Sequence, residues 1–213
     1  KATYYNTTDA TYYDGVVGNW LFDDARKDGD TEILEVGTNY YVGLFHSRGR
    51  EEYKTVDIRH ILITPETGTK AQGDEGYEDE QTQLKAAART KAEEILAQWK
   101  SGEATEDSFA QLAMENSADG SKYDGGLYTR VTKGWAVEEF NDWCFDASRK
   151  DGDTGIVDTT YGSHVMYFVG YDLPAWAASV TSDLQEKASS EWSTALSENA
   201  DVQQSDFGMK FVG

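Results

Sequence analysis

The hydrophobic and polar positions in the middle of the chain predict one strand followed by two helices. Apolar and polar residues alternate through "VDIRHILI" at 56–63, which is typical of a β-strand. From 84 to 99 the apolar residues recur at helical spacing, with Lys and Glu on the other face. Thr105 is suited to cap a second helix. Residues 64–81, rich in Gly and acidic residues, predict a solvated loop.

The pattern then continues with a strand, a helix and a hairpin. "LYTRV" at 127–131 predicts a short strand, 137–146 a helix, and 154–158 with 164–170 a hairpin. Behind Pro174, apolar residues fall every four positions and predict a C-terminal helix. Its apolar positions are Trp176, Val180, Leu184, Ala188, Trp192 and Leu196.

One stretch of the sequence occurs twice. A shift of 123 positions aligns residues 19–48 with 142–171 without a gap, and 12 of the 30 pairs are identical. Each copy predicts a short helix, a "KDGD" turn and two strands joined by a tight turn, so we infer an internal duplication. The identical pairs are Trp20/Trp143, Phe22/Phe145, Asp23/Asp146, Arg26 to Thr31 with Arg149 to Thr154, Ile33/Ile156, Val42/Val165 and Phe45/Phe168.

Charge and apolar content exclude several classes of partner. The 213 residues include 39 Asp and Glu against 19 Lys and Arg, a formal net charge of -20. This charge repels nucleic-acid phosphates and anionic lipids, so we expect no binding to nucleic acid or to a membrane surface. The sequence has no run of 18 apolar residues, so direct membrane insertion is not expected either.

Two further features concern the thiol and the start of the chain. Cys144, the single cysteine, falls in a predicted amphipathic helix, where a buried thiol behaves as a small hydrophobic group. The chain opens on Lys1 without an initiator Met or an apolar signal core. We therefore expect it to be a piece of a longer protein.

Residues 54–172 resemble the parvulin-type (PpiC-like) peptidyl-prolyl cis-trans isomerases, especially the extracytoplasmic foldases of bacteria. The resemblance lies in "VDIRHILI", "FAQLAMENSADGS", "DGGLY" and "FNDWCFDASRKDGDTGIVDTTYGSHVMYF", in that order. It implies an α+β fold with a four-stranded, mostly antiparallel sheet surrounded by helices. It also divides the chain into a partial, degenerate parvulin-like repeat at 1–50, an isomerase domain at 54–172 and a C-terminal helical extension at 173–213.

The same resemblance implies the site residues. His60 and His164 match the paired histidines of the central strands, and Asp119 matches a position that is cysteine or aspartate among relatives. Thr159 matches the threonine of the histidine hydrogen-bond network, whereas Ala136 stands where a methionine is common. The expected substrate-binding residues are Leu127, Trp135, Ala136, Phe140 and Tyr161.

The implied reaction is rotation about an X-Pro amide bond. Amide resonance sets a barrier of roughly 18–20 kcal/mol, and no covalent bond is broken. A thousandfold acceleration therefore needs only about 4 kcal/mol of selective stabilisation of the twisted amide. An apolar slot around the proline ring and a polar floor of hydrogen-bonded histidines can supply it without a nucleophile, a metal or a cofactor.

Two functions fit these residues. The first is an isomerase that assists folding of exported proteins and acts on unfolded or extended proline-containing polypeptides. The alternative is a noncatalytic peptide-binding chaperone, or holdase, with the same fold; Ala136 and the altered first copy favour it. A phosphate-directed isomerase is not expected, because the loop after the first strand is acidic rather than basic. The resemblance implies a location outside the cytoplasm.

The first copy lacks the residues assigned to the site. Tyr41 stands where the second copy has His164, and Val36 where it has Thr159. Residues 1–50 are therefore expected to form a noncatalytic scaffold or a client-contacting surface, and the incomplete repeat exposes a sheet edge that allows self-association. Its many tyrosines either pack the repeat or contact peptides. They are Tyr4, Tyr5, Tyr12, Tyr13, Tyr40 and Tyr41.

Overall fold

The structure is a computed structural model that describes residues 15–199. The chain divides into two compact units, Lys1–Arg50 and Glu51–Gly213, and each is described by itself. The tyrosines at positions 4, 5, 12 and 13 lie outside the described residues. Within residues 15–199, no helix combines the length and the apolar character needed to cross a membrane.

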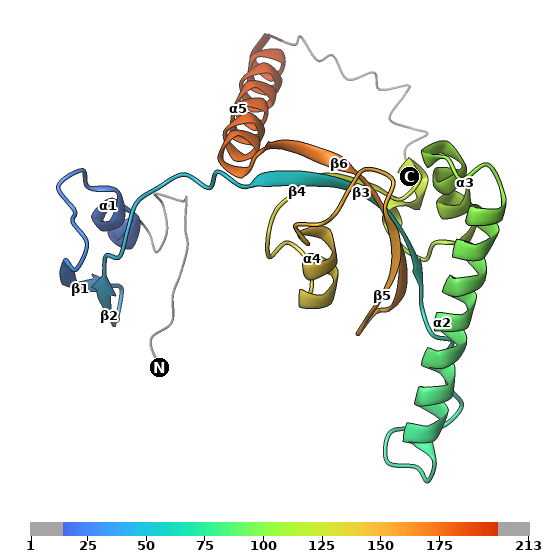
Figure 1. Ribbon diagram of the computed structural model, residues 1–213. Helices are drawn as coiled ribbons and strands as arrows, with labels where there is room; N and C mark the ends of the chain where they lie inside the picture. The colour runs from blue at the N-terminus through green and yellow to red at the C-terminus, as the bar shows by residue number, and fades with distance from the viewer. Residues whose placement is uncertain (1–14, 200–213) are drawn as a thin grey trace, which may run out of the picture. The chain divides into compact units, whose positions relative to one another are not determined.

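The second unit contains a four-stranded antiparallel sheet and four α-helices, as the sequence predicts (Figure 1). The strands lie in the order β4-β3-β6-β5, so the central pair joins segments far apart in the sequence. The strands are β3 (Lys54–Ile63), β4 (Leu127–Val131), β5 (Thr154–Thr159) and β6 (Gly162–Pro174). The helices are α2 (Tyr77–Ser101), α3 (Glu106–Asn116), α4 (Glu138–Cys144) and α5 (Ala175–Asn199), with a 3-10 turn, η1 (Gly120–Asp124), after α3.

Helices cover both faces of this sheet. Ile61 of β3 packs into a core with α2 and α3, whereas Ile58 of the same strand packs into a second core with α4. His60 lies on the α4 face, with its ring 5.5 Å from that of Phe140. The alternation seen in the sequence thus directs the two sets of β3 side chains into two different cores.

The helix boundaries follow from capping. Thr105 caps α3, as its sequence predicts, by accepting a hydrogen bond from the amide of Ser108. The Ser108 hydroxyl accepts one in turn from the amide of Thr105, so the helix begins with a capping box. The predicted loop 64–81 is too long, because α2 already begins at Tyr77. The acidic residues of its first turn interact favourably with the positive end of the helix dipole and so stabilise this start.

Cys144 lies in the α4 core, as expected. It is fully buried, and burial raises the pKa of its thiol to about 12. A thiol with such a pKa remains protonated at neutral pH and is a poor nucleophile.

The described part of the first unit is a helix packed on a hairpin. Its elements are α1 (Val16–Phe22), β1 (Thr31–Val36) and β2 (Asn39–Leu44), and Trp20, Leu34 and Phe45 form its buried core. Tyr41 packs against this core, whereas Tyr40 is exposed. The tyrosines of the repeat therefore do not share one environment.

The two copies of the duplicated sequence make matching contacts. The guanidinium of Arg26 lies 5.0 Å from the ring centre of Trp20, and that of Arg149 lies 4.2 Å from the ring centre of Trp143. In both "KDGD" turns the last aspartate accepts a hydrogen bond from the lysine amide at 2.9 Å. The shared letters therefore specify the same turn and the same packing of helix on hairpin.

Gly126, just before β4, provides a test of how closely the chain approaches β3 at His60. It has a positive φ of 75°, and a Cβ there would overlap the carbonyl oxygen of His60, whereas Gly134 has a φ of 79° with no atom within 4 Å. We expect Gly126→Ala to lower the free energy of unfolding by about 3 kcal/mol or more, and Gly134→Ala by about 1 kcal/mol. Urea denaturation followed by circular dichroism measures both; equal losses would contradict the close approach.

Candidate active site

Two buried histidines from the central strands form the centre of the site. On the β3–β6 pair, His60 lies opposite Met166 and Leu62 lies opposite His164, so both imidazoles face the same side. Their Nδ1 atoms are 3.1 Å apart and the rings are nearly parallel, at 16°. Only 3% of His60 and 5% of His164 is exposed. The structure therefore brings together residues that are 104 positions apart in sequence.

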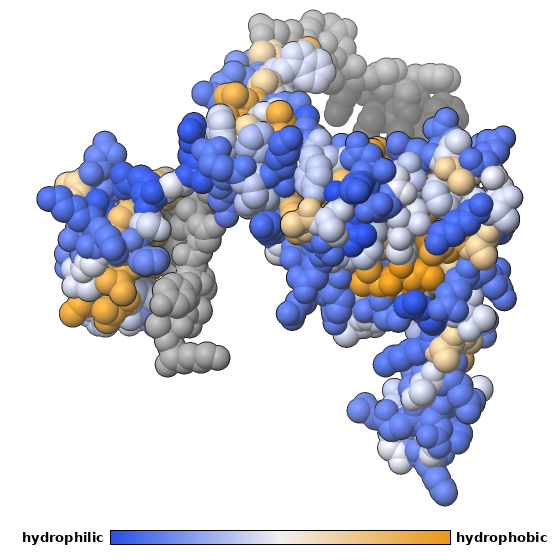
Figure 2. All heavy atoms as spheres, viewed as in Figure 1, coloured by the Kyte–Doolittle hydropathy of each residue, from blue (hydrophilic) through white to orange (hydrophobic). Residues whose placement is uncertain are grey.

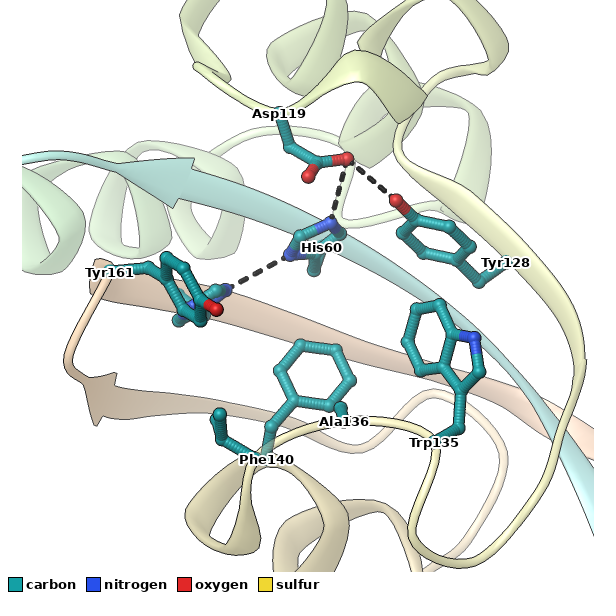
Figure 3. A pocket seen from close by; sticks show the side chains of 9 residues that line it. His60, Asp119, Tyr128, Trp135, Ala136, Phe140 and Tyr161 are labelled. Carbon is teal, nitrogen blue, oxygen red and sulfur yellow. Dashed lines mark hydrogen bonds and ion pairs between the residues drawn. The ribbon is translucent and has the colours of Figure 1, made fainter. Parts of the chain in front are cut away.

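Asp119 borders this pair from the turn after α3. It caps η1 by accepting a hydrogen bond from the amide of Ser121 at 2.8 Å. Its Oδ1 also accepts from the hydroxyls of Ser121, at 2.5 Å, and Tyr128, at 2.9 Å. His60 Nε2 lies 3.3 Å from the same oxygen. Figure 3 shows His60 and Tyr128 both directed at the Asp119 carboxylate.

These contacts determine the imidazole tautomers. Nε2 of His60 lies 3.3 Å from both Asp119 Oδ1 and the Ser121 hydroxyl. An ionised carboxylate only accepts hydrogen bonds, and the Ser121 hydroxyl already donates its proton to Asp119, so Nε2 of His60 carries its proton and Nδ1 is left as an acceptor. Nδ1 of His164 must then donate to it, which leaves Nε2 of His164 to accept from the Thr159 hydroxyl at 2.9 Å. The result is one directed chain of hydrogen bonds, from Thr159 through both rings to Asp119.

The electrostatics keep the carboxylate charged. Partial burial by itself would raise the pKa of Asp119, but the hydroxyl and amide of Ser121, together with His60 and Tyr128, stabilise the anion and lower its pKa to about 2. At neutral pH Asp119 is therefore the charged end of the hydrogen-bond chain.

Both histidines are neutral at neutral pH. Burial lowers the pKa of His60, although Asp119 opposes that effect. Burial, followed by the proximity of His60, lowers the pKa of His164 to about 4. In the contact between His60 and Asp119, the Nε2–H of a neutral ring therefore donates to a carboxylate, and the two groups are not an ion pair.

An open pocket of about 460 Å³ lies over the histidine pair. Its walls are aromatic: Trp135 lies 4.7 Å from Tyr128 and 6.2 Å from Phe140, measured between ring centres. In Figure 3, Ala136 and Phe140 lie on one side of the pocket, and Tyr161 lies on another. Asp119 is the only charged residue in this lining, as far as the described residues go. The lining residues are His60, Asp119, Tyr128, Trp135, Ala136, Val137, Phe140, Tyr161 and His164.

Of the residues expected from the sequence, most line the pocket, one contacts it indirectly and one lies outside it. Trp135, Ala136, Phe140 and Tyr161 line the pocket with His60, His164 and Asp119, whereas Thr159 reaches it only through its bond to His164. Leu127 is not part of the lining. It lies opposite Arg59 in the β3–β4 register, and the side chain of Arg59 pairs with Glu106 of α3, on the other face of the sheet.

Three further residues of the site, Tyr128, Val137 and Ser121, were not predicted from the sequence. Tyr128 follows Leu127 in β4 and lies opposite Ile58, whose side chain is on the α4 face. Because adjacent strand residues point to opposite faces, either Leu127 or Tyr128 could face the pocket, and alternation alone made Tyr128 a candidate. Ser121 had a weaker signal, since a serine two residues after an aspartate is common turn chemistry. In the described residues, no cluster of three or more His, Cys, Asp or Glu could hold a metal ion.

Comparison with known proteins places the chain in a family. Residues 43–169, more than half of the chain, match the PPIC-type PPIASE domain, and the chain belongs to this family. Its relatives include foldase protein PrsA 1 of Listeria innocua, 29% identical over 142 residues, and PrsA 1 of Listeria monocytogenes, 28% identical over 142 residues. These matches cover 64% of this chain and 39% of each relative, so the chain spans about two fifths of their length.

The solved structures that resemble the chain include PrsA from Bacillus subtilis. It has a TM-score of 0.46 and 22% sequence identity, with 72% of this chain and 52% of the other covered.

The depressed pKa of His164 predicts how stability depends on pH. The unfolded histidine binds a proton near its ordinary pKa of about 6.5, whereas the folded one resists protonation until about pH 4. The unfolded state therefore binds more protons in this window, and lowering the pH from 6.5 to 4 should destabilise the fold by about 3 kcal/mol through this group. The contribution is fully present above pH 6.5.

Urea denaturation of the wild type and of His164→Gln between pH 7 and 4 measures this term, and His46→Gln, at an exposed histidine, is the control. The His164 variant should lose the extra slope while the control keeps it. Titration of the His164 ring by NMR gives a second reading that does not need the variant to fold. A His164 pKa of 6.5 or above would contradict the arrangement.

Proposed function

We propose that the second unit is a peptidyl-prolyl cis-trans isomerase that acts on unfolded or extended polypeptides. The observation that carries this proposal is the aromatic pocket directly above a buried, neutral histidine pair. Membership of the PPIC-type PPIASE family and the similarity to proteins named foldase support it.

The pocket is suited to grip a proline ring. Phe140 and Trp135 offer flat apolar surfaces, and the methyl group of Ala136 leaves room between them. A volume of about 460 Å³ is within the usual range for small ligand sites, about 300–1,000 Å³. Insertion of proline removes water from the preceding carbonyl, which disfavours the charge-separated planar amide relative to the twisted one.

The hydrogen-bond chain supplies a polar floor that does not reorganise. Asp119 holds the proton of His60 on Nε2, and Thr159 completes the chain at His164. A preorganised set of dipoles stabilises the twisted amide without the cost of reorientation during rotation. Proton transfer is not required because no bond is broken, and the neutral rings are poor acids at pH 7.

The pocket still has a wall near position 136, although this chain has alanine where a methionine is common. Trp135 lines the same pocket with half of its surface exposed, and its indole packs on Tyr128. We infer that this indole takes the place of a longer side chain at 136. A noncatalytic holdase would not need the ordered histidine chain, so the isomerase is the better-supported function.

The proposed activity also indicates which polypeptides the protein acts on and where. We infer that it acts outside the cytoplasm on exported polypeptides, as the resemblance to extracytoplasmic foldases suggests. The first unit contains none of the residues of the histidine chain, so we infer a scaffold or client-contacting role for it.

A protease-coupled assay on X-Pro peptides tests the activity. The slow cis-trans phase should accelerate in proportion to the concentration of the chain, and a rate of the bound peptide about tenfold above that in buffer needs only about 1.4 kcal/mol of transition-state stabilisation. The same preparation is then tested for suppression of aggregation of an unfolded client. Suppressed aggregation without any acceleration would support the holdase and overturn the isomerase.

Replacing the charged end of the hydrogen-bond chain should slow the reaction. We expect Asp119→Asn to lower kcat/KM about tenfold or more, because an amide is uncharged and no longer fixes the proton of His60 on Nε2. Asp124→Asn, an exposed carboxylate of the same 3-10 turn, is the matched control and should retain activity. Equal activity of the two variants at equal thermal stability would contradict a role for the Asp119 charge in the reaction.

The charge of the pocket predicts its preference next to proline. Phosphate recognition needs Arg or Lys, and the described pocket lining contains neither, only the carboxylate of Asp119. Peptides with phosphoserine before proline should therefore be turned over no faster than their serine counterparts. Comparison of the two kcat/KM values by the same assay decides this, and a tenfold gain with phosphoserine would refute it.

A further inference from the structure

The hairpin of the first unit has one covered face and one open face. Leu34 of β1 lies in the core beneath α1. The side chains that alternate with it point the other way: Ile33 pairs with Val42, and both belong to the opposite face together with Leu44. These three aliphatic residues are 67%, 79% and 63% exposed. Three large aliphatic side chains in adjacent positions form an apolar patch that a partner would cover.

The duplicated sequence indicates what kind of partner fits this face. Ile33, Val42 and Leu44 align with Ile156, Val165 and Tyr167 of the second unit. There Val165 is fully buried, and the other two pack against the core formed with α2 and α3. The same sheet face is thus closed by helices in the second unit, whereas no described helix of the first unit covers it. An apolar helix is the structural complement of the open face.

The helix side of that core has a recognisable composition. The α2 residues in that core are a small residue, two aliphatic residues and a tryptophan: Ala92, Ile95, Leu96 and Trp99. A helix that closes the open face of the first unit should present a similar set.

One helix of this chain presents such a set to solvent. Helix α5 is held at its start by the bond from the amide of Ala175 to the carbonyl of Tyr53. Farther along, Leu184 is 62% exposed and Trp192 is 67% exposed, with Ala188 between them. Figure 2 shows apolar side chains at the surface both on the first unit and along α5.

We propose that the open face of the β1–β2 hairpin binds α5 of a second copy of the chain. Two strands of six residues give a face about 20 Å long and about 10 Å wide, which is small beside the roughly 800 Å² that each partner of a specific interface buries. A reciprocal exchange makes this contact twice, closes with two-fold symmetry, and covers both apolar surfaces of both copies. Both surfaces carry net negative charge, so the dimer strengthens as salt screens that repulsion.

Analytical ultracentrifugation of the whole chain tests the proposal. Val42→Glu and Leu184→Glu each place a negative charge in the contact and should weaken the dimer at least tenfold, because each also removes a large apolar side chain from the interface. The controls are Thr38→Glu, in the exposed hairpin turn, and Ser182→Glu, on the opposite side of α5 from Leu184. A monomeric wild type, or a dimer that both test variants leave intact, would overturn the proposal.

Cross-linking distinguishes docking of α5 on a second copy from docking of α5 on the hairpin of its own chain. Cys144 is buried and its thiol unreactive, so a bis-maleimide reports on introduced cysteines alone. Differently tagged Val42→Cys and Leu184→Cys chains, mixed, should form a cross-linked pair between the two tags. Cross-linking within single chains of the double variant, without a pair in the mixture, would assign α5 to its own hairpin and overturn the proposal.

The proposal does not depend on the isomerase activity. None of the substituted positions lines the pocket, so kcat/KM on X-Pro peptides should stay within twofold of the wild type in every variant. Loss of the dimer with retained kcat/KM supports the docking surface. An inactive wild type leaves the sedimentation result independent of the catalytic question.

Discussion

The antiparallel pairing of β3 with β6 is the constraint on which the rest of the site depends. Its register places His60 and His164 on one face, two positions apart along neighbouring strands. A slip of a single residue would turn one of the two rings toward the α2–α3 core, because strand side chains alternate between faces. Once both rings face α4, burial keeps them neutral, and the carboxylate of Asp119 gives their hydrogen bonds one direction.

Much of this fold could be predicted from local sequence pattern. Strand β3 and helix α3 have strong signals, alternation in one case and a capping threonine in the other, and both formed where expected. The start of α2 could not be placed as well. Residues 77–83 carry no apolar stripe, and their helical state depends on acidic residues at the helix terminus, which are equally common in loops.

The site was less predictable than the fold. The histidines and Asp119 were named from the sequence because the resemblance ties them to ordered motifs, yet the structure alone decides which neighbour reaches them. Leu127 and Tyr128 are adjacent, and only the register of β4 against β3 shows that the tyrosine faces Asp119. Periodicity gives the alternation of a strand but not which of its faces meets the pocket, since that depends on long-range pairing.

Comparison of the two copies distinguishes the contacts that the repeated residues make from the contacts that form the candidate site. The shared residues form contacts within the copy: the arginine over the tryptophan, the aspartate at the turn and the phenylalanine of the core. The site instead joins β6 to β3 and η1, both outside the repeat, and there the copies differ, with Tyr41 in place of His164. Contacts that are local in sequence hold the helix on the hairpin in each copy, whereas the site needs partners distant in sequence. Within residues 15–199, the second copy has the neighbouring strand and turn that complete the histidine chain, whereas the first copy forms a helix packed on a hairpin.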